Sequence, residues 1–351
     1  MKFFFAVLSV LIIAGCEQRV FLNKLPDIDY KDGRYVFYSA GREYDKVLLK
    51  KDSSNTELAS CRETESELGI FSCDDAGYYD LYLITGTDTV LANNTYIGTY
   101  EQGSFKITAL DVAQGDCFII HPPDGLPSVI DGGFGSSGWE DWHGGGENRL
   151  ADHLIAGGFT QLKYIIETHS DLDHSGGLKD VVEDERFSRQ EYLTHDSDLP
   201  APGDTLFFSP TVKGVMLHYY STADTSDVEE NDRSVCIKLI YHDLEMIFTG
   251  DISQQIEISL IDDQLIDPYE QYEILKIAHH GSGYSSSQEF LNAVDPLYSL
   301  ICVGEGNPYH HPSEETIERI KKTDSGVLRT DINRTVNIFS DGTSFQISYF
   351  E

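Results

Sequence analysis

Apolar and polar positions follow two different patterns along the chain, and the change falls near residue 103. Between residues 34 and 100, short β-like runs are separated by turn residues: RYVFYSA, KVLLKK, LGIFSC, YYDLYLIT and TVLANNTYIGTY. From Phe105 onward, buried-looking runs such as FKITALDV, CFIIH and YIIETHS alternate with helix-like stretches at 148–159 and 313–323. The pattern predicts a small all-β domain over residues 17–103 and an α/β layered domain over residues 104–351.

Within the β-rich part, Asp75, Gly77 and Tyr79 form a D-x-G-x-Y arrangement that resembles the tyrosine corner of immunoglobulin-like sandwiches. An immunoglobulin-like fold is therefore the expectation for this domain. Cys73 precedes the tyrosine, so the core disulfide of that family is not predicted. Cys61 and Cys73 are the only close pair of cysteines, and the sequence leaves open whether they are bonded.

The N-terminus, MKFFFAVLSVLIIAGCEQ, carries one lysine, a short apolar run and small residues before Cys16. It is typical of a secretory signal peptide, the alternative being a buried N-terminal strand. Residues 13–16 also resemble the bacterial lipoprotein box, which implies that residues 1–16 are a signal peptide and that Cys16 is lipidated. We therefore expect an exported protein held by a lipid anchor at the periplasmic face of an outer membrane or at the cell surface.

Composition narrows the classes of partner. Apolar residues make up 40% of the chain, enough for a packed core, and the formal net charge is −34. So acidic a chain repels polyanions, which disfavours a broad interface with nucleic acid. The sequence makes no prediction about protein partners or oligomeric state.

The stretch IIETHSDLDHSGGL places four polar side chains directly after an apolar run: His169, Asp171, Asp173 and His174. This is either a polar turn or a site. Imidazoles and carboxylates are the preferred ligands of zinc, manganese and iron, and a tight turn after a buried strand can aim several of them at one point. A metal site is the favoured interpretation.

Other predicted strands also end in potential ligands, which strengthens this interpretation. The strand MIFTGDI ends in Gly-Asp, and ILKIAHHGS ends in a pair of histidines. A third segment, LDVAQGDCFIIHPPDGLPSVIDGG, has a strand-turn-strand pattern with aspartates at its strand ends. The potential ligands of the three segments are Asp111, Asp116, Asp131, Asp251, His279 and His280.

Taken together, LDVAQGD, VIDGG, THSDLDHSGGL, NDRSVCIKL, IFTGDI, LKIAHHGS, HHPSEETIERI and LRTD resemble the metallo-β-lactamase superfamily. Within it they resemble the nuclease-like domain of the ComEC competence proteins. The resemblance covers about residues 105–345 and implies an αββα sandwich with metals at one edge between the two sheets. It also implies two divalent metal ions, zinc or manganese, as cofactors.

Carried over by position, the resemblance gives each ligand a place. His169 and Asp171 would hold the first metal, Asp173 and His174 the second, and Asp251 would bridge both. One histidine of the pair that follows the strand ILK would complete the second site. His280 is favoured over His279, which would then support it from outside the coordination sphere.

Two features depart from the superfamily pattern. Asp171 stands where the commonest motif has a histidine, and a carboxylate favours harder ions such as manganese. The third superfamily motif also lacks its histidine, since NDRSVCIKL offers only Asn231 and Ser234 near the site, so the first metal is expected to be held weakly. The other histidines between the motifs, His195, His218 and His242, are expected at the surface or in loops.

The predicted chemistry is hydrolysis by an activated water, with Asp251 bridging the metals and Asp173 orienting or deprotonating the water. His311 would bind substrate or donate a proton, the alternative being a role at a helix start before Pro312. Ser282 would line the mouth of the site or simply form a turn, and Asn231 would lie near the substrate.

Three functions remain open at this stage. The first is a binuclear phosphodiesterase that acts on a small-molecule or cell-envelope substrate. The second is a carboxylic ester or lactone hydrolase that uses the same metals. The third is a non-catalytic surface binding protein with a degenerate metal site.

Overall fold

The structure is a computed structural model. It describes the backbone of six strands before residue 98 and residues 105–135, 149–221, 227–270 and 272–349, the side chains of residues 149 and 156 excepted. The predicted signal peptide, Cys16, Cys61, Cys73 and residues 136–148 lie outside the described residues.

The N-terminal part contains two three-stranded antiparallel sheets, in the orders β1-β2-β4 and β3-β5-β6. Their strands are β1 (Asp27–Lys31), β2 (Arg34–Tyr38), β3 (Lys46–Lys51), β4 (Gly69–Phe71), β5 (Gly77–Thr85) and β6 (Asp88–Ile97). These strands coincide with the predicted β-like runs. The immunoglobulin-like arrangement and the domain boundary at residue 103 stay predictions.

Two seven-stranded sheets form the second part of the chain. The first has the order β11-β10-β9-β8-β7-β19-β20, and its strands are β7 (Phe105–Ala109), β8 (Cys117–His121), β9 (Ser128–Gly132), β10 (Gln161–Ile166), β11 (Ser188–Leu193), β19 (Val336–Ser340) and β20 (Phe345–Ser348). The second follows the order β12 to β18, with β12 (Thr205–Phe207), β13 (Lys213–His218), β14 (Cys236–Tyr241), β15 (Leu244–Phe248), β16 (Ile274–Lys276), β17 (Tyr298–Ile301) and β18 (Gly326–Arg329).

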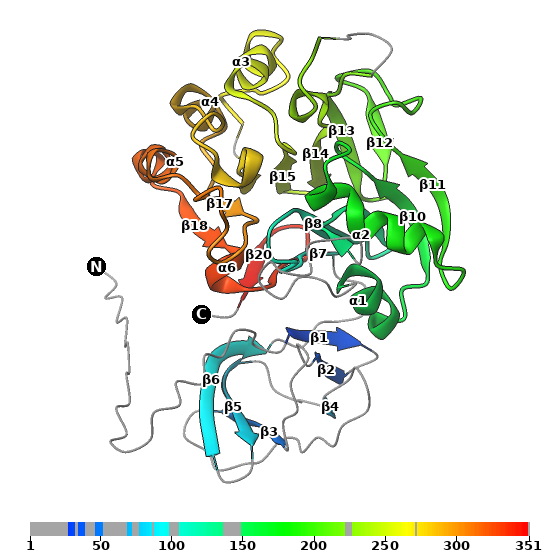
Figure 1. The fold of residues 1–351 in the computed structure, drawn as a ribbon, viewed down its shortest axis with the longest axis vertical. Coiled ribbons are helices and arrows are strands. Elements are labelled where there is room, and N and C mark those ends of the chain that lie inside the picture. Colours follow the sequence, from blue (N-terminus) through cyan, green and yellow to red (C-terminus); the bar gives the residue numbers. More distant parts are fainter. Residues whose placement is uncertain are drawn as a thin grey trace.

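Helices cover the outer face of each sheet (Figure 1). On the first sheet these are α1 (Arg149–Gly157) and α2 (Leu172–Glu183); on the second they are α3 (Gln254–Asp262), α4 (Gln288–Val294) and α5 (Glu314–Ile320), while α6 (Thr330–Asn333) follows β18. Among the helices that the structure describes, none has the length and apolar character needed to cross a bilayer.

Alternation along the strands explains the layers. In β8, Phe118 and Ile120 belong to the core between the two sheets, whereas Cys117 and Ile119 pack beneath the helices of the first sheet. Because successive side chains of a strand point to opposite faces, an apolar run buried on both faces forms the centre of such a sandwich. Phe118 meets Phe248 of the opposite sheet edge to face, with ring centroids 4.9 Å apart.

The strand order also brings the predicted ligands to one edge. Strands β9 and β10 are parallel in the first sheet, and β15, β16 and β17 are parallel in the second. The segments that follow β10, β15 and β16 therefore leave the sheets on the same side, which is where α/β folds commonly place their ligands.

Candidate metal centre

The centre is assembled from strand ends and the first turn of one helix. His169 follows β10, Asp251 follows β15, and His280 follows β16. Asp173 and His174 lie in the first turn of α2, which brings a carboxylate and an imidazole to the same end. The carboxylate of Asp171, the residue before that helix, makes no capping hydrogen bond and so remains available to a ligand.

The turn before β8 packs against this helix start. Gly115 has a φ of +125°, and a Cβ at this position would lie 2.1 Å from the carbonyl oxygen of Asp173. The next residue, Asp116, donates its backbone N–H to the same carbonyl at 3.1 Å. Only glycine allows the two segments to approach this closely.

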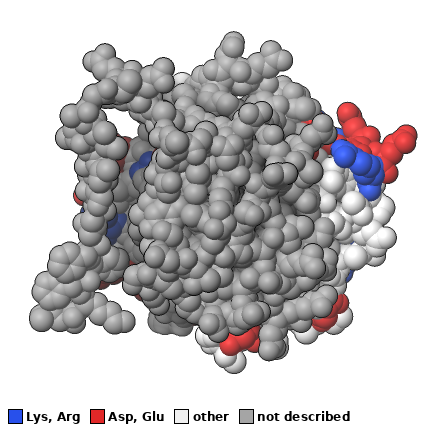
Figure 2. Space-filling view, turned by 90° about the horizontal axis from the view of Figure 1, so that it is seen from below, with Lys and Arg blue, Asp and Glu red and all other residues white. Residues whose placement is uncertain are grey.

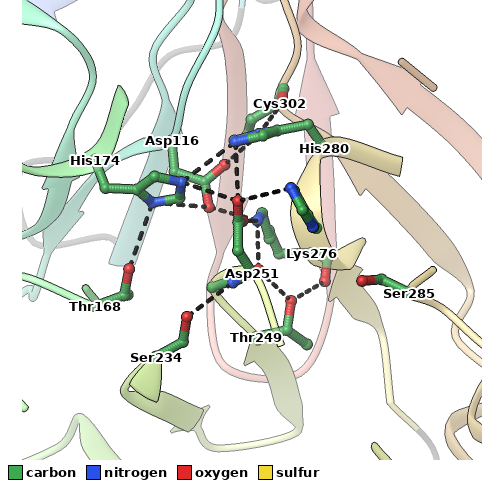
Figure 3. A network of polar contacts seen from close by, with 12 residues as sticks. Asp116, Thr168, His174, Ser234, Thr249, Asp251, Lys276, His280, Ser285 and Cys302 are labelled. Atoms are coloured by element: carbon green, nitrogen blue, oxygen red, sulfur yellow. Dashed lines mark hydrogen bonds and ion pairs between the residues drawn. The ribbon is translucent and has the colours of Figure 1, made fainter. Parts of the chain in front are cut away.

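Two imidazoles are fixed in a defined orientation. His174 donates from Nδ1 to Asp131 Oδ2 at 2.7 Å. His280, shown in Figure 3, donates from Nδ1 to the carbonyl oxygen of Cys302 at 2.7 Å. With Nδ1 committed on both rings, Nε2 is the atom left to bind a metal, and the two Nε2 atoms lie 3.2 Å apart. Burial lowers the pKa of both imidazoles, but Asp251 and the other neighbouring carboxylates raise it further, so without a metal each Nε2 holds a proton that a bound cation would displace.

A third imidazole follows the same logic. His169 Nδ1 lies 3.1 Å from Thr168 Oγ1 and 3.4 Å from Ser234 Oγ, and both hydroxyl protons are already donated, to Asp131 and to the Asn231 carbonyl respectively. Nδ1 must therefore be the donor. The lone pair remains on His169 Nε2, which is buried and has no hydrogen-bond partner among the described residues.

Two carboxylates complete the cluster. Asp173 Oδ2 lies 3.3 Å from His280 Nε2, while Asp251 Oδ2 lies 3.3 Å from the same nitrogen and 3.4 Å from His174 Nε2. Burial opposes ionisation of both carboxyls, but the neighbouring imidazoles outweigh it and hold the pKa of each below its usual value. Both groups are therefore anionic at neutral pH.

Two groups of donors are compact enough to hold a cation, with their ligand atoms within 4.8 Å of one another. One group is His169, His174 and Asp251, and the other is Asp173, His174 and His280. Mixed nitrogen and carboxylate donors suit zinc, manganese or iron. The buried, unpartnered Nε2 of His169 and the facing Nε2 atoms of the other two imidazoles are what a bound divalent cation would satisfy, so these residues fit the predicted cofactor.

A third group, formed by Asp116, Asp131 and His174, has the same compactness. Its Asp116 carboxylate is already neutralised by the ammonium of Lys276. Lys276 Nζ lies 2.6 Å from Asp116 Oδ2 and 3.2 Å from Asp251 Oδ1. Burial lowers the pKa of this amine, but the two carboxylates raise it further, and the net direction is upward.

The remaining predicted ligands lie at the edge of the cluster. The side chain of Asp171 is 52% exposed, and its Oδ2 lies 3.6 Å from His169 Nε2. His279 is partly exposed, and its Nε2 lies 4.0 Å from Asp251 Oδ2. Both His279 and His280 adopt left-handed backbone conformations, with φ of 51° and 52°, a strain that non-glycine residues sustain mainly at functional sites.

The predicted substrate-binding residues have different surroundings. Asn231 Nδ2 lies 3.4 Å from the His279 ring nitrogens. His311 lies edge-on to His279, with ring centroids 5.6 Å apart, and exposed Tyr309 stacks on its other side. Ser282 is buried, and its hydroxyl accepts a hydrogen bond from the Tyr284 backbone, so it serves the loop after the histidine pair.

Three residues support the centre in ways that the sequence does not predict. Asp116 and Asp131, which the sequence offers as potential ligands, instead contact Lys276 and His174. Lys276 has no predicted role, although a lone lysine in the apolar run ILKIA is a signal. Of the other histidines expected at the surface or in loops, His195 lies in a turn after β11, although it is only 5% exposed. The expectation was wrong for His218, which is the last residue of β13 and 7% exposed.

The comparisons with known proteins agree with this geometry. Residues 110–214 match the Metallo-beta-lactamase superfamily. Two mixed sheets with helices on their outer faces are the αββα sandwich of that superfamily, so the second part of the chain has the metallo-β-lactamase fold, as predicted.

Within the superfamily, the chain is similar to the competence proteins. It is 26% identical over 258 residues to ComE operon protein 3 of Bacillus subtilis, covering 66% of this chain and 32% of that protein. It is 28% identical over 191 residues to Competence protein ComA of Neisseria gonorrhoeae, covering 52% and 26% respectively. The ComEC-like resemblance is thereby confirmed, and the chain spans about a third or less of the length of these relatives.

Among solved structures, CmlA, a diiron β-hydroxylase from Streptomyces venezuelae, aligns with 66% of this chain and 53% of its own. The identity is 11% and the TM-score is 0.40.

Proposed function

We propose that this protein is an exported, lipid-anchored phosphodiesterase that uses two divalent metal ions. The observation that carries the proposal is the convergence of three imidazole Nε2 atoms and two carboxylates within 4.8 Å in each group. The Nε2 of His169 is buried without a hydrogen-bond partner among the described residues, and a bound cation would supply one. Lipidation of Cys16 and export rest on the sequence resemblance.

When bound, divalent cations would supply Lewis acidity and activate a water for attack on an ester bond. The chain's own residues would do the rest. Asp173, ionised and with a side chain 19% exposed, is the ligand best placed to accept a proton or orient a water. Asp251 Oδ2 lies between the imidazoles and would hold the two halves of the centre together.

His311 fits substrate binding better than proton donation. Burial, followed by the charges of His279 and His280, lowers its pKa to about 4, so the ring is neutral at physiological pH. Its Nδ1 is buried and has no hydrogen-bond partner among the described residues. A neutral imidazole keeps one N–H, which can donate a hydrogen bond to a substrate oxygen, whereas it carries no second proton to release near pH 7.

A small substrate fits the charge of the chain better than a long polyanion. Acidic residues outnumber basic ones by 59 to 25, and Figure 2 shows acidic side chains gathered in patches at the rim of the described surface. A nucleic acid would be repelled over most of its length. A small phosphodiester or a phosphorylated cell-envelope ester presents only one or two anionic groups, which the metal charge can attract locally.

The test combines metal content with turnover of bis-p-nitrophenyl phosphate in the presence of manganese or zinc. Wild-type protein is compared with Asp173→Asn and with Asp262→Asn, a control in an exposed carboxylate of α3 that makes no contact with the centre. We expect about two metals per chain, and a loss of turnover of about 100-fold or more in Asp173→Asn only.

Three results would count against parts of the proposal. Hydrolysis of p-nitrophenyl acetate or a lactone without any phosphodiester turnover would favour the carboxylic ester alternative. Absence of metal and of any difference between the two variants would leave a binding protein on a hydrolase scaffold. A mature protein without acyl groups on Cys16 would refute the lipid anchor alone.

A further inference from the structure

A fully buried lysine forms the floor of the candidate centre. Lys276 has no solvent-exposed surface, and its ammonium has three hydrogen-bond acceptors within reach. These are Asp116 Oδ2 at 2.6 Å, the Gly250 carbonyl oxygen at 2.8 Å and Asp251 Oδ1 at 3.2 Å. All three N–H bonds of the ammonium are therefore used, and none is left for a substrate.

This arrangement fixes the orientation of the carboxylate between the imidazoles. Asp251 is held at its backbone N–H by Ser234 Oγ, at 3.0 Å, and at Oδ1 by the lysine. Only Oδ2 faces the nitrogens of His174 and His280 (Figure 3). The geometry restricts Asp251 to ligation through a single oxygen.

The lysine also compensates charge when no metal is bound. Asp116 is 1% exposed and Asp251 is 3% exposed. Two buried carboxylates near each other repel unless a cation lies between them. Lys276 Nζ lies 2.6 Å from Asp116 Oδ2 and 3.2 Å from Asp251 Oδ1, and unlike a bound metal it cannot dissociate.

We propose that Lys276 is a positioning residue that keeps the centre in its metal-binding geometry before any metal arrives. It would do so by holding Asp251 in a one-oxygen orientation and by neutralising Asp116. This inference rests on the proposed metal centre. It predicts that losing the lysine weakens metal binding even when the fold and the net charge of the cluster are kept.

The experiment uses the full chain and measures the manganese and zinc dissociation constants by competition with a chromophoric chelator. The key variant is Asp116→Asn/Lys276→Met, which removes one negative and one positive charge and so leaves the net charge unchanged. Asp116→Asn alone, which keeps the lysine, is the matched control. Melting temperatures without metal report whether each variant is folded.

We expect the double variant to bind metal about 10- to 100-fold more weakly than wild type, whose net charge it shares, which is the usual effect of losing a group that orients a ligand. Asp116→Asn, which keeps the lysine, should lose much less, and a double variant that binds within twofold of wild type would overturn the inference. If the double variant does not fold, Lys276→Gln decides, since its shorter neutral side chain should also weaken binding, and an affinity equal to wild type would refute the role.

The wild-type measurement separates this inference from the proposed function. If the wild-type protein binds no metal, both fail together. If it binds about two metals and the lysine variants bind equally well, only the role of Lys276 fails.

Discussion

The substitution Asp131→Asn tests the tautomer argument on which the centre depends. Asp131 is fully buried and accepts three hydrogen bonds, from the Thr168 N–H at 2.8 Å, from the Thr168 hydroxyl at 2.7 Å and from His174 Nδ1 at 2.7 Å. The Thr168 N–H can only donate, so it fixes the amide oxygen of an asparagine on its own side. The amide NH2 must then face His174 Nδ1.

An amide NH2 group donates hydrogen bonds but cannot accept one, so the N–H at His174 Nδ1 would lose its acceptor. The ring would then carry its proton on Nε2 and accept a hydrogen bond at Nδ1. That shift removes the lone pair that the metal needs. Losing such an orienting partner costs about 10- to 100-fold in metal affinity. One charge-assisted hydrogen bond is also lost, which we expect to lower the free energy of unfolding by about 1.5–3 kcal/mol, so that the domain still folds.

The assay is a chelator competition for manganese and zinc, with urea unfolding in parallel. Nitrogen chemical shifts of ring-labelled histidine would report the tautomer of His174 directly. Asn337→Ala is the control, because it removes another buried hydrogen bond, from Thr108 Oγ1 at 2.9 Å, between strands β7 and β19. Undiminished metal affinity in Asp131→Asn, with His174 still protonated at Nδ1, would refute the reasoning.

Three further predictions concern other parts of the domain. Gly177→Ala should lower the free energy of unfolding by about 1–3 kcal/mol in urea titrations, because its Cβ would lie 2.0 Å from the Gly132 carbonyl oxygen; an unchanged midpoint would contradict this close packing. His311→Asn should raise KM by about tenfold at constant kcat; because the pKa of His311 is about 4, the ring stays neutral and the difference from wild type should be constant from pH 8 to pH 5. Cys117, Cys236 and Cys302 are buried, and burial raises the pKa of the Cys236 thiol, so peptide mapping should find all three unmodified after treatment of the native protein with a thiol reagent.

Several features of the centre could be predicted because they are local in sequence. The motif from His169 to His174 spans one turn after a strand and the first turn of a helix, so spacing alone brings its members together. The Gly-Gly pair that follows has a physical reason as well. Gly176 and Gly177 let α2 pack against the backbone of residues 132–134, where a Cβ would lie 2.0 Å from a carbonyl oxygen in each case.

The supporting contacts could not be predicted in the same way, because they join segments far apart in the chain. The bond between His174 and Asp131 spans 43 residues, and the ion pair of Lys276 with Asp116 joins the two sheets. Hydrophobic pattern identifies the strands but does not determine which strand ends meet. The choice between His279 and His280 was of this kind, since it depends on two consecutive left-handed residues that turn the second imidazole inward.

The segment 230–234 lies where the superfamily pattern places its third histidine, and it contributes anchoring contacts instead. Glu230 accepts hydrogen bonds from the backbone and the hydroxyl of Ser170, at 2.9 Å and 2.6 Å. Asp232 accepts two from Ser253, at 2.8 Å and 3.1 Å. One short segment thus ties the loop after β10 to the loop after β15.

Because the segment 230–234 supplies structural contacts rather than a metal-binding histidine, the two metal positions have different numbers of preorganised donors. On one side, Asp173, His174 and His280 offer three donors with little or no exposure. On the other side, His169 Nε2 is buried, but its nearest additional carboxylate is Asp171, whose side chain is 52% exposed and must leave water and lose rotamer freedom to bind. Preorganised donors bind a metal more tightly than donors that must be ordered. The position formed by Asp173, His174 and His280 should therefore fill at a lower metal concentration than the position at His169.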